Sequence, residues 1–432
     1  MIAPPTAAAA AARPAHYLRA VSRGAAIAGI VGSAGASAAI ARLKLPAARR
    51  HHARAGERAA RRLDRLGGAY LKAGQLLSTR PDLLSDAQRA PLRRLCDHAT
   101  PAGDGRGLAA LLAGDGVVDV VERPFAAGSV TDVHLARRAD TGERVAVKIL
   151  RPDARARFTA DLTLVKGCTR LASRLPIFRL IPTIAAVDML AEAVAGHLDL
   201  HTEAAHQARL AEAFAARDGV MVPRPHLDLC TPSALVMDYV QDALRIDDPR
   251  LHPRLQATAA VAALRALYDM LFNCGLVHCD LHPGNMLVTS DGVLVLIDFG
   301  YACELDEDQQ IEFARLFRAM ALGDPDAIAG VIVRTAVVLP ERLDEDALVA
   351  DLEPLMSDIT RSSAERFNAA RFTTALFLIS RRHRILASPT FSMAVVSLIT
   401  IEGVLKELTP GLDFQREALP SVLGCLARAG VA

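Results

Sequence analysis

The sequence predicts an α+β fold of two lobes, a small β-rich lobe followed by a larger and mainly helical lobe. Two observations lead to this prediction. Strand-like segments gather between residues 117 and 150, where apolar residues alternate and turn residues separate the segments. Beyond residue 255 the apolar residues mostly recur with helical spacing. A chain of 432 residues is long enough for both lobes, and a hydrophobic content of 51% can fill their cores.

The charge and the cysteine content exclude several classes of protein. Lys and Arg total 50 and Asp and Glu total 48, so the net charge is +2, and no pattern of basic and aromatic residues indicates a nucleic-acid partner. The seven cysteines are odd in number, scattered and without C-x-x-C spacing. They indicate reduced thiols rather than disulfides or a zinc site, so we expect the catalytic region to be cytoplasmic.

Residues 1–56 are predicted to be disordered in part and to contact a membrane in part. Residues 24–41 form an uncharged run of eighteen, and an arginine-rich stretch follows it as far as Arg62. The run consists mostly of Gly, Ala and Ser, which contribute little to insertion into a bilayer. We therefore expect a helix that packs on protein or lies on anionic lipid rather than a membrane span. A signal peptide is disfavoured, because the basic residues follow the apolar run.

The elements of the two lobes follow in order. Residues 57–98 have a helical pattern, within an extension placed at 57–110. Strands are predicted at 117–121, 130–137, 144–150, 234–239, 285–289 and 293–297, and a long helix at 186–216. Asp140-Thr141-Gly142 forms the hairpin turn between the second and third strands. The small lobe is thus expected over 111–240 and the large helical lobe over 241–432.

A second apolar stretch, residues 377–405, is another candidate for a membrane span. Arg381, Arg382 and Arg384 interrupt it, and the clean apolar run that remains is short. We expect a buried helix of the large lobe at this position.

The strongest chemical signal is the segment LVHCDLHPGNMLV, which is followed by LVLIDFG. Asp280 and Asn285 are five residues apart, and Asp298 follows Asn285 by thirteen residues, which is room for one β-hairpin. Phosphoryl transfer needs one acid that orients the attacking oxygen, and an Asn and a second Asp that hold Mg²⁺ against the phosphates of ATP. The spacing therefore predicts Asp280 as the catalytic acid and Asn285 and Asp298 as metal ligands.

The two histidines of this segment allow another interpretation. His278, Asp280 and His282 could form a metal triad, but the Pro283-Gly284-Asn285 run and the downstream Asp298 favour phosphoryl transfer. His278 is expected to be a buried structural imidazole that bonds backbone near the metal-binding Asp298.

A lysine upstream of the catalytic segment is predicted to bind phosphate. Lys148 lies in RVAVKIL, a strand whose valines and isoleucine face the other way. Its acidic partner should come from the following helix, and Glu203 is our choice. Asp199 lies one turn earlier on the same predicted face and could also approach the phosphates or a metal, while Glu192 is an alternative partner.

The segment PFAAGSVTDVHLAR, residues 124–137, stands where a Gly-rich phosphate-binding loop would be. It has one glycine, Gly128, and its backbone N–H groups can still cap phosphates. Ser129 can add a hydroxyl, whereas Ala126 and Ala127 allow fewer left-handed conformations than glycine does. These four residues are predicted to bind nucleotide.

A fourth motif, LKAGQLLSTRPDLL, carries Lys72 and Gln75 on one face of a predicted helix. Taken alone, both would be surface residues of an amphipathic helix. Together with the other motifs, this K-x-G-Q run resembles the signature of the UbiB (AarF/ADCK) family of atypical kinases. The resemblance covers about residues 60–320. It implies a bilobal protein-kinase-like fold with a helical N-terminal extension that folds over the nucleotide site, where Lys72 and Gln75 reach phosphates or active-site acids.

The resemblance also implies roles for other residues. Lys148 would be the phosphate-binding lysine, Glu203 its ion-pair partner and Asp280 the catalytic-loop acid. Met237-Asp238-Tyr239 resembles the hinge that meets adenine through its backbone, so Asp238 and Tyr239 are predicted to bind the nucleotide.

Several positions depart from the family pattern. The E-x-D pair of the family is His197-Leu198-Asp199 here, so its first acid is missing, and His206 replaces an asparagine. Gly128 stands where an alanine is common, which would loosen the loop. Cys279 replaces the arginine that many kinases place before the catalytic acid, so control by a phosphorylated activation loop is not expected.

The resemblance implies an enzyme that uses ATP and Mg²⁺ as an ATPase or kinase and supports ubiquinone or other isoprenoid-quinone lipid biosynthesis. The expected partners are ATP, anionic lipid and quinone-pathway lipids and enzymes, with a homodimer considered and nucleic acid excluded. The expected location is cytoplasmic, peripheral at the inner face of the cell membrane. Two alternatives stay open: a small-molecule kinase of the aminoglycoside or choline kinase type, and a nucleotide-gated scaffold that does not turn ATP over.

Overall fold

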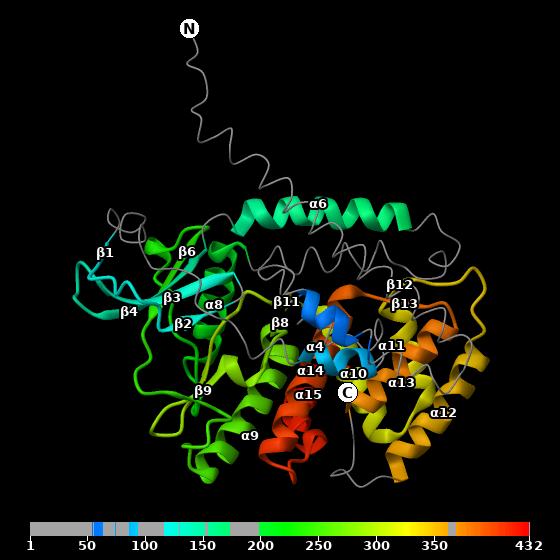
Figure 1. The fold of residues 1–432 in the computed structure, drawn as a ribbon. Helices are drawn as coiled ribbons and strands as arrows, with labels where there is room; N and C mark the ends of the chain where they lie inside the picture. The colour runs from blue at the N-terminus through cyan, green and yellow to red at the C-terminus, as the bar shows by residue number, and fades with distance from the viewer. Residues whose placement is uncertain are drawn as a thin grey trace. The chain divides into compact units, whose positions relative to one another are not determined.

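The structure is a computed structural model of the chain, and the parts that it describes form two compact units (Figure 1). The described residues are 54, 56–63, 74, 86–93, 116–128, 130–151, 154–172, 198–361 and 369–431. The first unit comprises the described parts of Met1–Gly103, Ala126–Asp132 and Leu150–Leu198. The second comprises those of Asp104–Phe125, Val133–Ile149 and Asp199–Ala432. The uncharged run at 24–41 and the K-x-G-Q residues Lys72 and Gln75 lie outside the described residues.

The described part of the first unit consists mainly of helices together with the short strand β2 (Ala126–Ala127), the residues that follow it and the last residue of the strand that ends at Leu150. Residues 56–63 are helical, as are α4 (Asp86–Arg93) and α6 (Ala154–Ala172). A Cβ added to Gly56 would lie 2.7 Å from the carbonyl oxygen of Gln88, so the absence of a side chain lets the two N-terminal helical segments approach closely. Both segments fall within the predicted helical extension.

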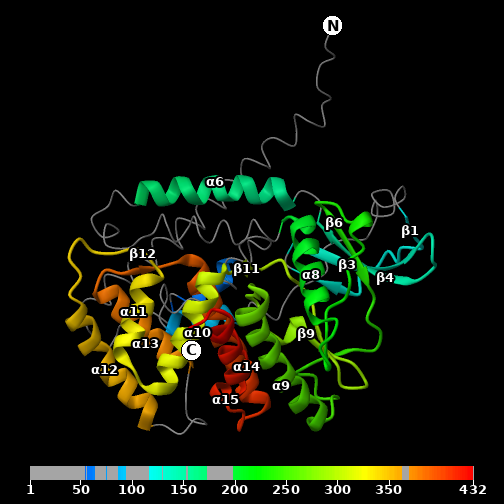
Figure 2. The ribbon, with the colours of Figure 1, turned by 180° about the vertical axis from the view of Figure 1, so that it is seen from behind.

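A small antiparallel sheet opens the second unit, with strand order β1-β3-β4-β6. Its strands are β1 (Val117–Val118), β3 (Thr131–Arg138), β4 (Arg144–Leu150) and β6 (Ala234–Asp238). Alternate residues of these strands form one apolar cluster, in which Ala136, Val147 and Val236 are almost completely buried. Helix α8 (Leu200–Phe214) packs beside β6, as both Figure 1 and Figure 2 show.

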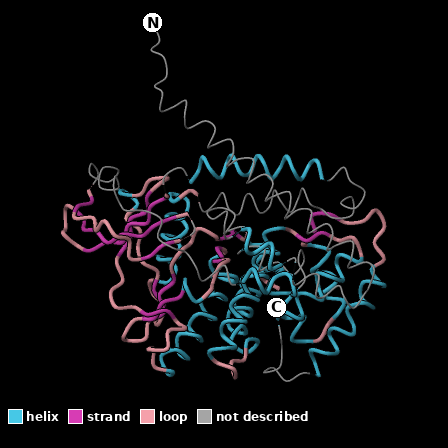
Figure 3. The backbone as a smooth tube through the Cα atoms, viewed as in Figure 1, coloured by secondary structure: helices cyan, strands magenta, loops and turns pink. Residues whose placement is uncertain are grey.

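The rest of the second unit is mainly helical, with short strands among the helices (Figure 3). Two of its sheets matter for the site: β5-β10-β9-β7, and the pair β8–β11. The strands are β5 (Val220–Met221), β7 (Leu244–Arg245), β8 (Leu276–His278), β9 (Met286–Val288), β10 (Leu294–Leu296), β11 (Ala302–Glu304), β12 (Ala336–Val338) and β13 (Leu386–Ala387). The helices are α9 (Pro253–Asp269), α10 (Glu307–Leu322), α11 (Pro325–Arg334), α12 (Glu345–Arg361), α13 (Ala369–Arg382), α14 (Pro389–Leu408) and α15 (Phe414–Arg428).

Aromatic side chains fill the core of this helical region. The ring of Phe317 meets those of Tyr268 and Phe272 edge to face, with centroids 5.7 and 5.4 Å apart. Phe313 of α10 stacks on Phe391 of α14 with centroids 4.0 Å apart. These contacts join α9, α10 and α14 into one core. The α+β fold with a small sheet and a larger helical part is therefore the predicted one, while the domain boundaries at 56, 110 and 240 stay predictions.

Two predicted elements differ from the observed ones. The strand expected at 117–121 ends at Val118, because Asp119 has a φ of +53°, which ends the extended backbone. The helix expected over 186–216 does not run through Asp199. Asp199 is extended, at φ −120° and ψ 94°, and caps α8 by accepting a hydrogen bond from the backbone N–H of His201. Residues 186–197 lie outside the described part of the chain.

Residues 377–405 form the end of α13, the strand β13 and most of α14 instead of one helix. One face of α14 is buried, including Phe391, Val395 and Ile401, which agrees with the expected position in the core of the large lobe. Among the described residues, no helix combines the length and the apolar character needed to cross a bilayer.

Candidate active site

Lys148 forms an ion-pair cluster with two acids that come from distant parts of the chain. Its Nζ lies 2.6 Å from Oε1 of Glu203 in α8 and 2.9 Å from Oδ1 of Asp298, which follows β10. Val147 and Ile149 of β4 face the apolar cluster, so strand alternation turns Lys148 to the other side. Burial alone would lower the pKa of Lys148, but the charges of Asp298 and Glu203 outweigh it and hold that pKa above its usual value. The ammonium group is therefore charged at neutral pH.

Asp298 is held in an unusual backbone conformation. Its φ is +63°, in the left-handed region that residues other than glycine seldom adopt. The residues on either side are fixed: the N–H of Ile297 donates to the carbonyl of Asn285 at 3.1 Å, and the side chain of Phe299 is fully buried. Strain of this kind persists where the surroundings impose it, and it is common at functional sites.

The buried ring of His278 connects the two segments that carry the predicted catalytic acid and metal ligands. The backbone N–H of Asp280 donates to Nδ1 of His278 at 3.1 Å, so Nε2 carries the proton and donates to the carbonyl of Ile297 at 3.0 Å. Burial lowers the pKa of His278, which keeps the ring neutral as this pattern requires. Both ring nitrogens are thus used within the protein, and this excludes the metal triad.

The loop after Asp280 orients His282 and Asn285. Nδ2 of Asn285 donates to the carbonyl of Asp280 at 2.9 Å, which directs its side-chain oxygen elsewhere. Nδ1 of His282 accepts the N–H of Gly284 at 3.0 Å, and its Nε2 lies 4.0 Å from Oδ2 of Asp280. A Cβ on Gly284 would come within 2.6 Å of Cε1 of His282, so this turn requires glycine. The loop thus sets the positions of two polar side chains around the carboxylate of Asp280.

Helix α14 contacts the segment that begins at His278, a contact that the sequence did not predict. Oγ of the fully buried Ser397 donates to the carbonyl of His278 at 2.7 Å. The thiol of Cys279 lies 3.3 Å from that of Cys303 on the neighbouring strand β11. The sequence does contain one signal for this contact, a serine within an apolar helix. A hydroxyl buried in such a helix needs a hydrogen-bond acceptor nearby.

One face of α8 follows the segment from Asp298 to Glu304. One turn after Glu203, His206 hydrogen-bonds the backbone of Phe299, and Arg209 pairs with Glu304 at 3.1 Å. Burial lowers the pKa of His206 despite this hydrogen bond and the nearby charge of Glu304. Asp199 is the cap of α8, and its carboxylate accepts hydrogen bonds from the N–H of His201 and the hydroxyl of Thr202, at 3.1 and 3.0 Å. Its predicted approach to phosphates or a metal stays a prediction.

The predicted hinge is ordered by contacts within the second unit. The backbone N–H of Asp238 donates to the carbonyl of Arg224 at 3.0 Å, so any adenine contact at the hinge must use another backbone group. The ring of Tyr239 meets Phe125 edge to face at 5.7 Å, and the guanidinium of Arg144 lies 5.7 Å from the centre of the same ring. These contacts hold the ring of Tyr239 in the predicted hinge.

The alanine-rich loop belongs to the first unit. Ala126 and Ala127 form β2, and the N–H of Gly128 donates to the carbonyl of Thr131 at 2.8 Å. A Cβ at Gly128 would lie 2.8 Å from Oγ1 of Thr131, so a larger residue here would displace that side chain. The expected loosening of the loop by Gly128 stays a prediction. Ser129, like Lys72 and Gln75, lies outside the described residues, and its role stays a prediction.

The comparisons with known proteins agree with this geometry. The family model for the ABC1 atypical kinase-like domain matches residues 119–332. A "Probable protein kinase UbiB" of Pseudomonas fluorescens is 28% identical over 374 residues, which are 83% of this chain and 69% of that protein. Its namesake from Shewanella baltica is 27% identical over 381 residues, which are 84% and 69% of the two chains.

The structural comparison concerns the fold. The chain is similar to Rv3197 of Mycobacterium tuberculosis, which was solved in complex with erythromycin, with a TM-score of 0.51 and 23% identity. The match covers 81% of this chain and 94% of the other. The kinase-like fold is thus shared. The chain therefore carries an ABC1 atypical kinase-like domain over residues 119–332 and is similar, over more than four fifths of its length, to proteins named as probable UbiB kinases.

Proposed function

We propose that this protein is a UbiB-type enzyme that uses Mg-ATP as an ATPase or phosphotransferase. The observation that carries the proposal is the buried Lys148 held between Glu203 and Asp298, beside the loop from Asp280 to Asn285. A lysine, its acidic partner, a catalytic acid and two oxygen ligands are the set of groups that phosphoryl transfer requires.

The donor atoms suit a hard divalent cation. Asn285 offers an amide oxygen, because its nitrogen is bound to the carbonyl of Asp280, and Asp298 offers a carboxylate that is 31% exposed. Oxygen ligands of this kind fit Mg²⁺, which prefers a few protein ligands together with phosphates. Asn285 and Asp298 would hold the ion, which when bound neutralises the charge on the phosphates.

The other residues position and charge the site. Lys148 keeps a permanent positive charge near the phosphate position, and Glu203 fixes the direction of its ammonium group. Asp280 presents a carboxylate, and the His278 ring fixes its backbone relative to Asp298 through Ile297. In this proposal Asp280 orients an attacking hydroxyl and accepts its proton.

We assign the quinone link and the membrane location by resemblance to the UbiB family. The activity would serve ubiquinone or other isoprenoid-quinone lipid biosynthesis, with the protein peripheral at the inner face of the cell membrane. The group that accepts the phosphoryl group is part of the same proposal. Where that acceptor is water, the reaction is simple hydrolysis of ATP.

The test measures ATP binding and turnover by the purified chain with Mg²⁺, with and without liposomes that contain anionic lipid. Asp298→Asn removes a proposed metal ligand, so turnover should fall by about a hundredfold or more. Asp218→Asn, an exposed acid in the turn after α8, is the matched control and should leave turnover unchanged. Nucleotide binding without turnover under any condition would favour the scaffold, and no binding would overturn the proposal.

A further inference from the structure

The side chain of His282 lies in the loop from Asp280 to Asn285 and has no part in the mechanism described so far. Its Nδ1 accepts the N–H of Gly284 at 3.0 Å, so the ring proton is on Nε2. The backbone holds the same residue on both sides: its N–H donates to the carbonyl of Asp280, and its carbonyl accepts the N–H of Asn285, each at 2.9 Å. The loop itself therefore sets the position of the ring and the direction of the N–H at Nε2.

This N–H of His282 is available to a ligand. In the part of the chain that the structure describes, Nε2 makes no hydrogen bond, and Oδ2 of Asp280 lies 4.0 Å from it, which is too long for one. The side chain of His282 is 28% exposed and that of Asp280 is 15% exposed, so a small group from solvent can reach both.

A separation of 4.0 Å between a donor and an acceptor fits one oxygen atom. Hydrogen bonds to a hydroxyl oxygen are about 2.7–3.0 Å long, so a single oxygen can lie within that distance of both Nε2 and Oδ2. Such an oxygen accepts the N–H of His282 and donates its own proton to the carboxylate of Asp280. A carbonyl oxygen cannot do this, because it has no proton to donate. The two side chains together therefore select a hydroxyl group or a water molecule.

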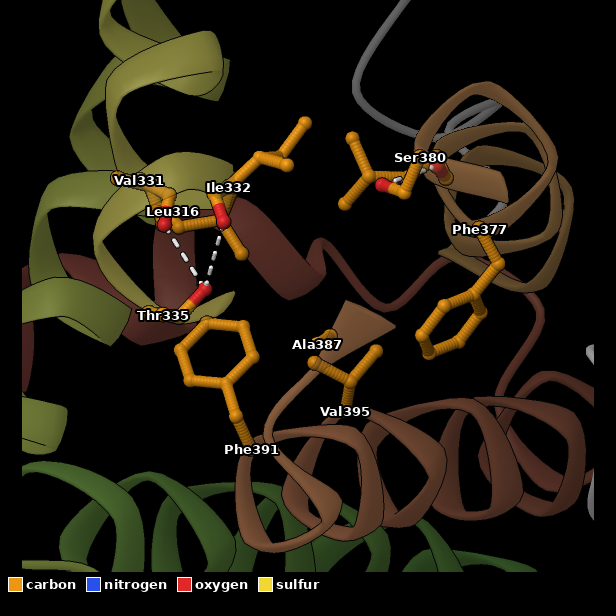
Figure 4. Close-up of a pocket in the computed structure, with 10 residues that line it drawn as sticks. Leu316, Val331, Ile332, Thr335, Phe377, Ser380, Ala387, Phe391 and Val395 are labelled. Atoms are coloured by element: carbon orange, nitrogen blue, oxygen red, sulfur yellow. Dashed lines mark hydrogen bonds between the residues drawn. The ribbon is translucent and has the colours of Figure 1, made fainter. Parts of the chain in front are cut away.

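The cavity in the helical region offers no comparable donor. Its volume is about 30 Å³, and Figure 4 shows two hydroxyl groups among the described side chains that line it. Oγ1 of Thr335 donates to the carbonyl of Val331 at 2.8 Å, and Oγ of Ser380 donates to that of Leu376 at 2.9 Å. The other lining side chains are apolar. Of these two places, only the loop at Asp280 has a donor and an acceptor for an attacking oxygen.

We propose that His282 is a further catalytic residue, which holds the attacking oxygen of the phosphoryl acceptor against Asp280. The inference rests on the proposed ATP-dependent function, and the acceptor is water or an alcohol. Its oxygen forms a bond to the γ-phosphorus of ATP, while the bond from that phosphorus to the bridging oxygen breaks and its electron pair stays with ADP. The proton of the acceptor passes to Asp280, and His282 keeps its own.

The contribution of His282 is the orientation of this oxygen. Its N–H occupies one lone pair and Asp280 takes the proton, so the remaining lone pair can face the phosphorus. Phosphoryl transfer depends mostly on positioning, because the protein does little covalent chemistry in it. An oxygen held by Asp280 alone can rotate about one hydrogen bond, and misplacement of this kind slows a reaction strongly.

Two substitutions separate the roles of the two ring nitrogens. His282→Asn places an oxygen where Nδ1 accepts the N–H of Gly284, and it removes the N–H at Nε2. His282→Gln does the reverse, since its amide N–H extends as far as Nε2 and its contact with Gly284 is lost. We expect ATP turnover with Mg²⁺ to fall by roughly ten- to a hundredfold in His282→Asn and by less in His282→Gln. A purely structural role predicts the opposite order.

A transition-state analogue gives a second measurement, which does not depend on turnover. ADP with aluminium fluoride mimics the transferred phosphoryl group with its attacking water, so its affinity relative to that of ADP alone should also fall in His282→Asn. His252→Asn is the matched control, because Nδ1 of His252 accepts the N–H of Arg254 at 3.2 Å at the exposed start of α9. Its turnover and affinities should equal those of the unaltered chain.

The possible outcomes separate this inference from the proposed function. Turnover in His282→Asn that equals or exceeds that in His282→Gln, or an unchanged affinity ratio in His282→Asn, would overturn the role of His282 and leave the ATP-dependent function intact. An unaltered chain without turnover would overturn both. Urea unfolding shows whether each variant folds. If His282→Gln does not, His282→Asn decides alone, and turnover like that of His252→Asn would overturn the inference.

Discussion

The side chain of Lys148 shows how much one buried charge depends on its partners. Lys148→Met would remove the ammonium group that lies 2.6 Å from Glu203, a side chain only 2% exposed. Breaking a buried ion pair from one side costs about 3–5 kcal/mol, because the other charge stays buried. We expect the free energy of unfolding, measured with urea, to fall by that amount.

The double variant Lys148→Met/Glu203→Leu is the control for this prediction. It removes both charges and should recover most of the lost stability, since apolar residues often replace a buried pair at little cost. A double variant as unstable as the single one would show that the charge of Glu203 is not the cause.

A buried hydroxyl allows a prediction about alkaline pH. The hydroxyl of Tyr268 donates to the carbonyl of Phe414 at 2.7 Å, and burial, with the nearby Glu402 and Glu417, raises the pKa of Tyr268 well above its usual value. Only the neutral form of Tyr268 fits the fold. Its contribution to the free energy of unfolding is therefore complete below about pH 10, and it is lost as the pH rises above the pKa that tyrosine has in the unfolded chain.

Tyr268→Phe should therefore cost about 1–3 kcal/mol at pH 7, because the carbonyl of Phe414 loses its donor. Between pH 10 and 11 the free energy of unfolding of the variant should fall less steeply with pH than that of the unaltered chain. Urea unfolding at each pH measures both slopes. Equal slopes would contradict the role given to this hydroxyl.

Sequence reasoning reaches some of these residues and not others, for a physical reason. Strand alternation turns Lys148 away from the apolar cluster, and the structure shows the ion pair with Glu203 that the sequence predicted. The ion pair with Asp298, which was predicted as a metal ligand, is an addition from the structure. Nothing local relates Ser397 to His278, which are 119 residues apart, because only packing of α14 brings them together. At Asp199 the sequence leaves two roles open, because an acid before a helix suits a cap as well as a ligand, and the structure shows the cap.

At the scale of elements, the start of β8 depends on one glycine. Gly275 has a φ of +62°, and a Cβ there would lie 2.7 Å from the carbonyl oxygen of Leu305 and 2.6 Å from Nε2 of Gln310. Gly275→Ala therefore adds a collision with backbone to the usual strain of a left-handed residue. We expect a loss of about 2–4 kcal/mol in urea unfolding, with poorer pairing of β8 and β11.

Gly142→Ala is a matched control for this effect. Gly142 has a φ of +73°, and no atom lies within 4 Å of the position of an added Cβ. Only backbone strain remains, so a loss of about 1 kcal/mol is expected. Equal losses at both glycines would show that the contact with Leu305 adds nothing.

Elements with strong local signals were the best predicted. Strand β4 has the predicted bounds, because its alternation and its hairpin turn agree. The strand predicted at 117–121 ends before Asp119, which has a positive φ. The alternation of apolar residues does not reveal this backbone angle, because a polar residue is expected between them in either case. The helix expected across Asp199 fails because helical periodicity continues through a capping residue that interrupts the backbone.

At the scale of the whole molecule, α15 closes the core around α9. Arg265 pairs with Glu417 at 2.7 Å, and Arg428 donates to the carbonyl of Phe272 at 2.7 Å. Phe414, Val422 and Leu426 are buried on the inner face of α15. Burying each such side chain contributes about 1.5–3 kcal/mol, so together they approach the 5–15 kcal/mol that stabilise a typical domain.

A chain that stops at Gly411 should therefore lose cooperative unfolding of the helical region and bind an apolar dye. Calorimetry and dye fluorescence would measure both effects. The milder change Arg428→Ala removes one contact of α15 and should keep a single transition at a lower temperature. A shortened chain that unfolds as the full one does would contradict this role of α15.

The bond between Ser397 and the carbonyl of His278 also bears on where this protein can be divided. The matched family domain stops at residue 332, yet the helix that bonds its strand β8 spans Pro389–Leu408. The boundary drawn by sequence similarity is therefore not the boundary of the part that folds. A chimera that exchanges this domain between relatives must carry its own α14, or the recipient's helix must supply a hydroxyl at the same position.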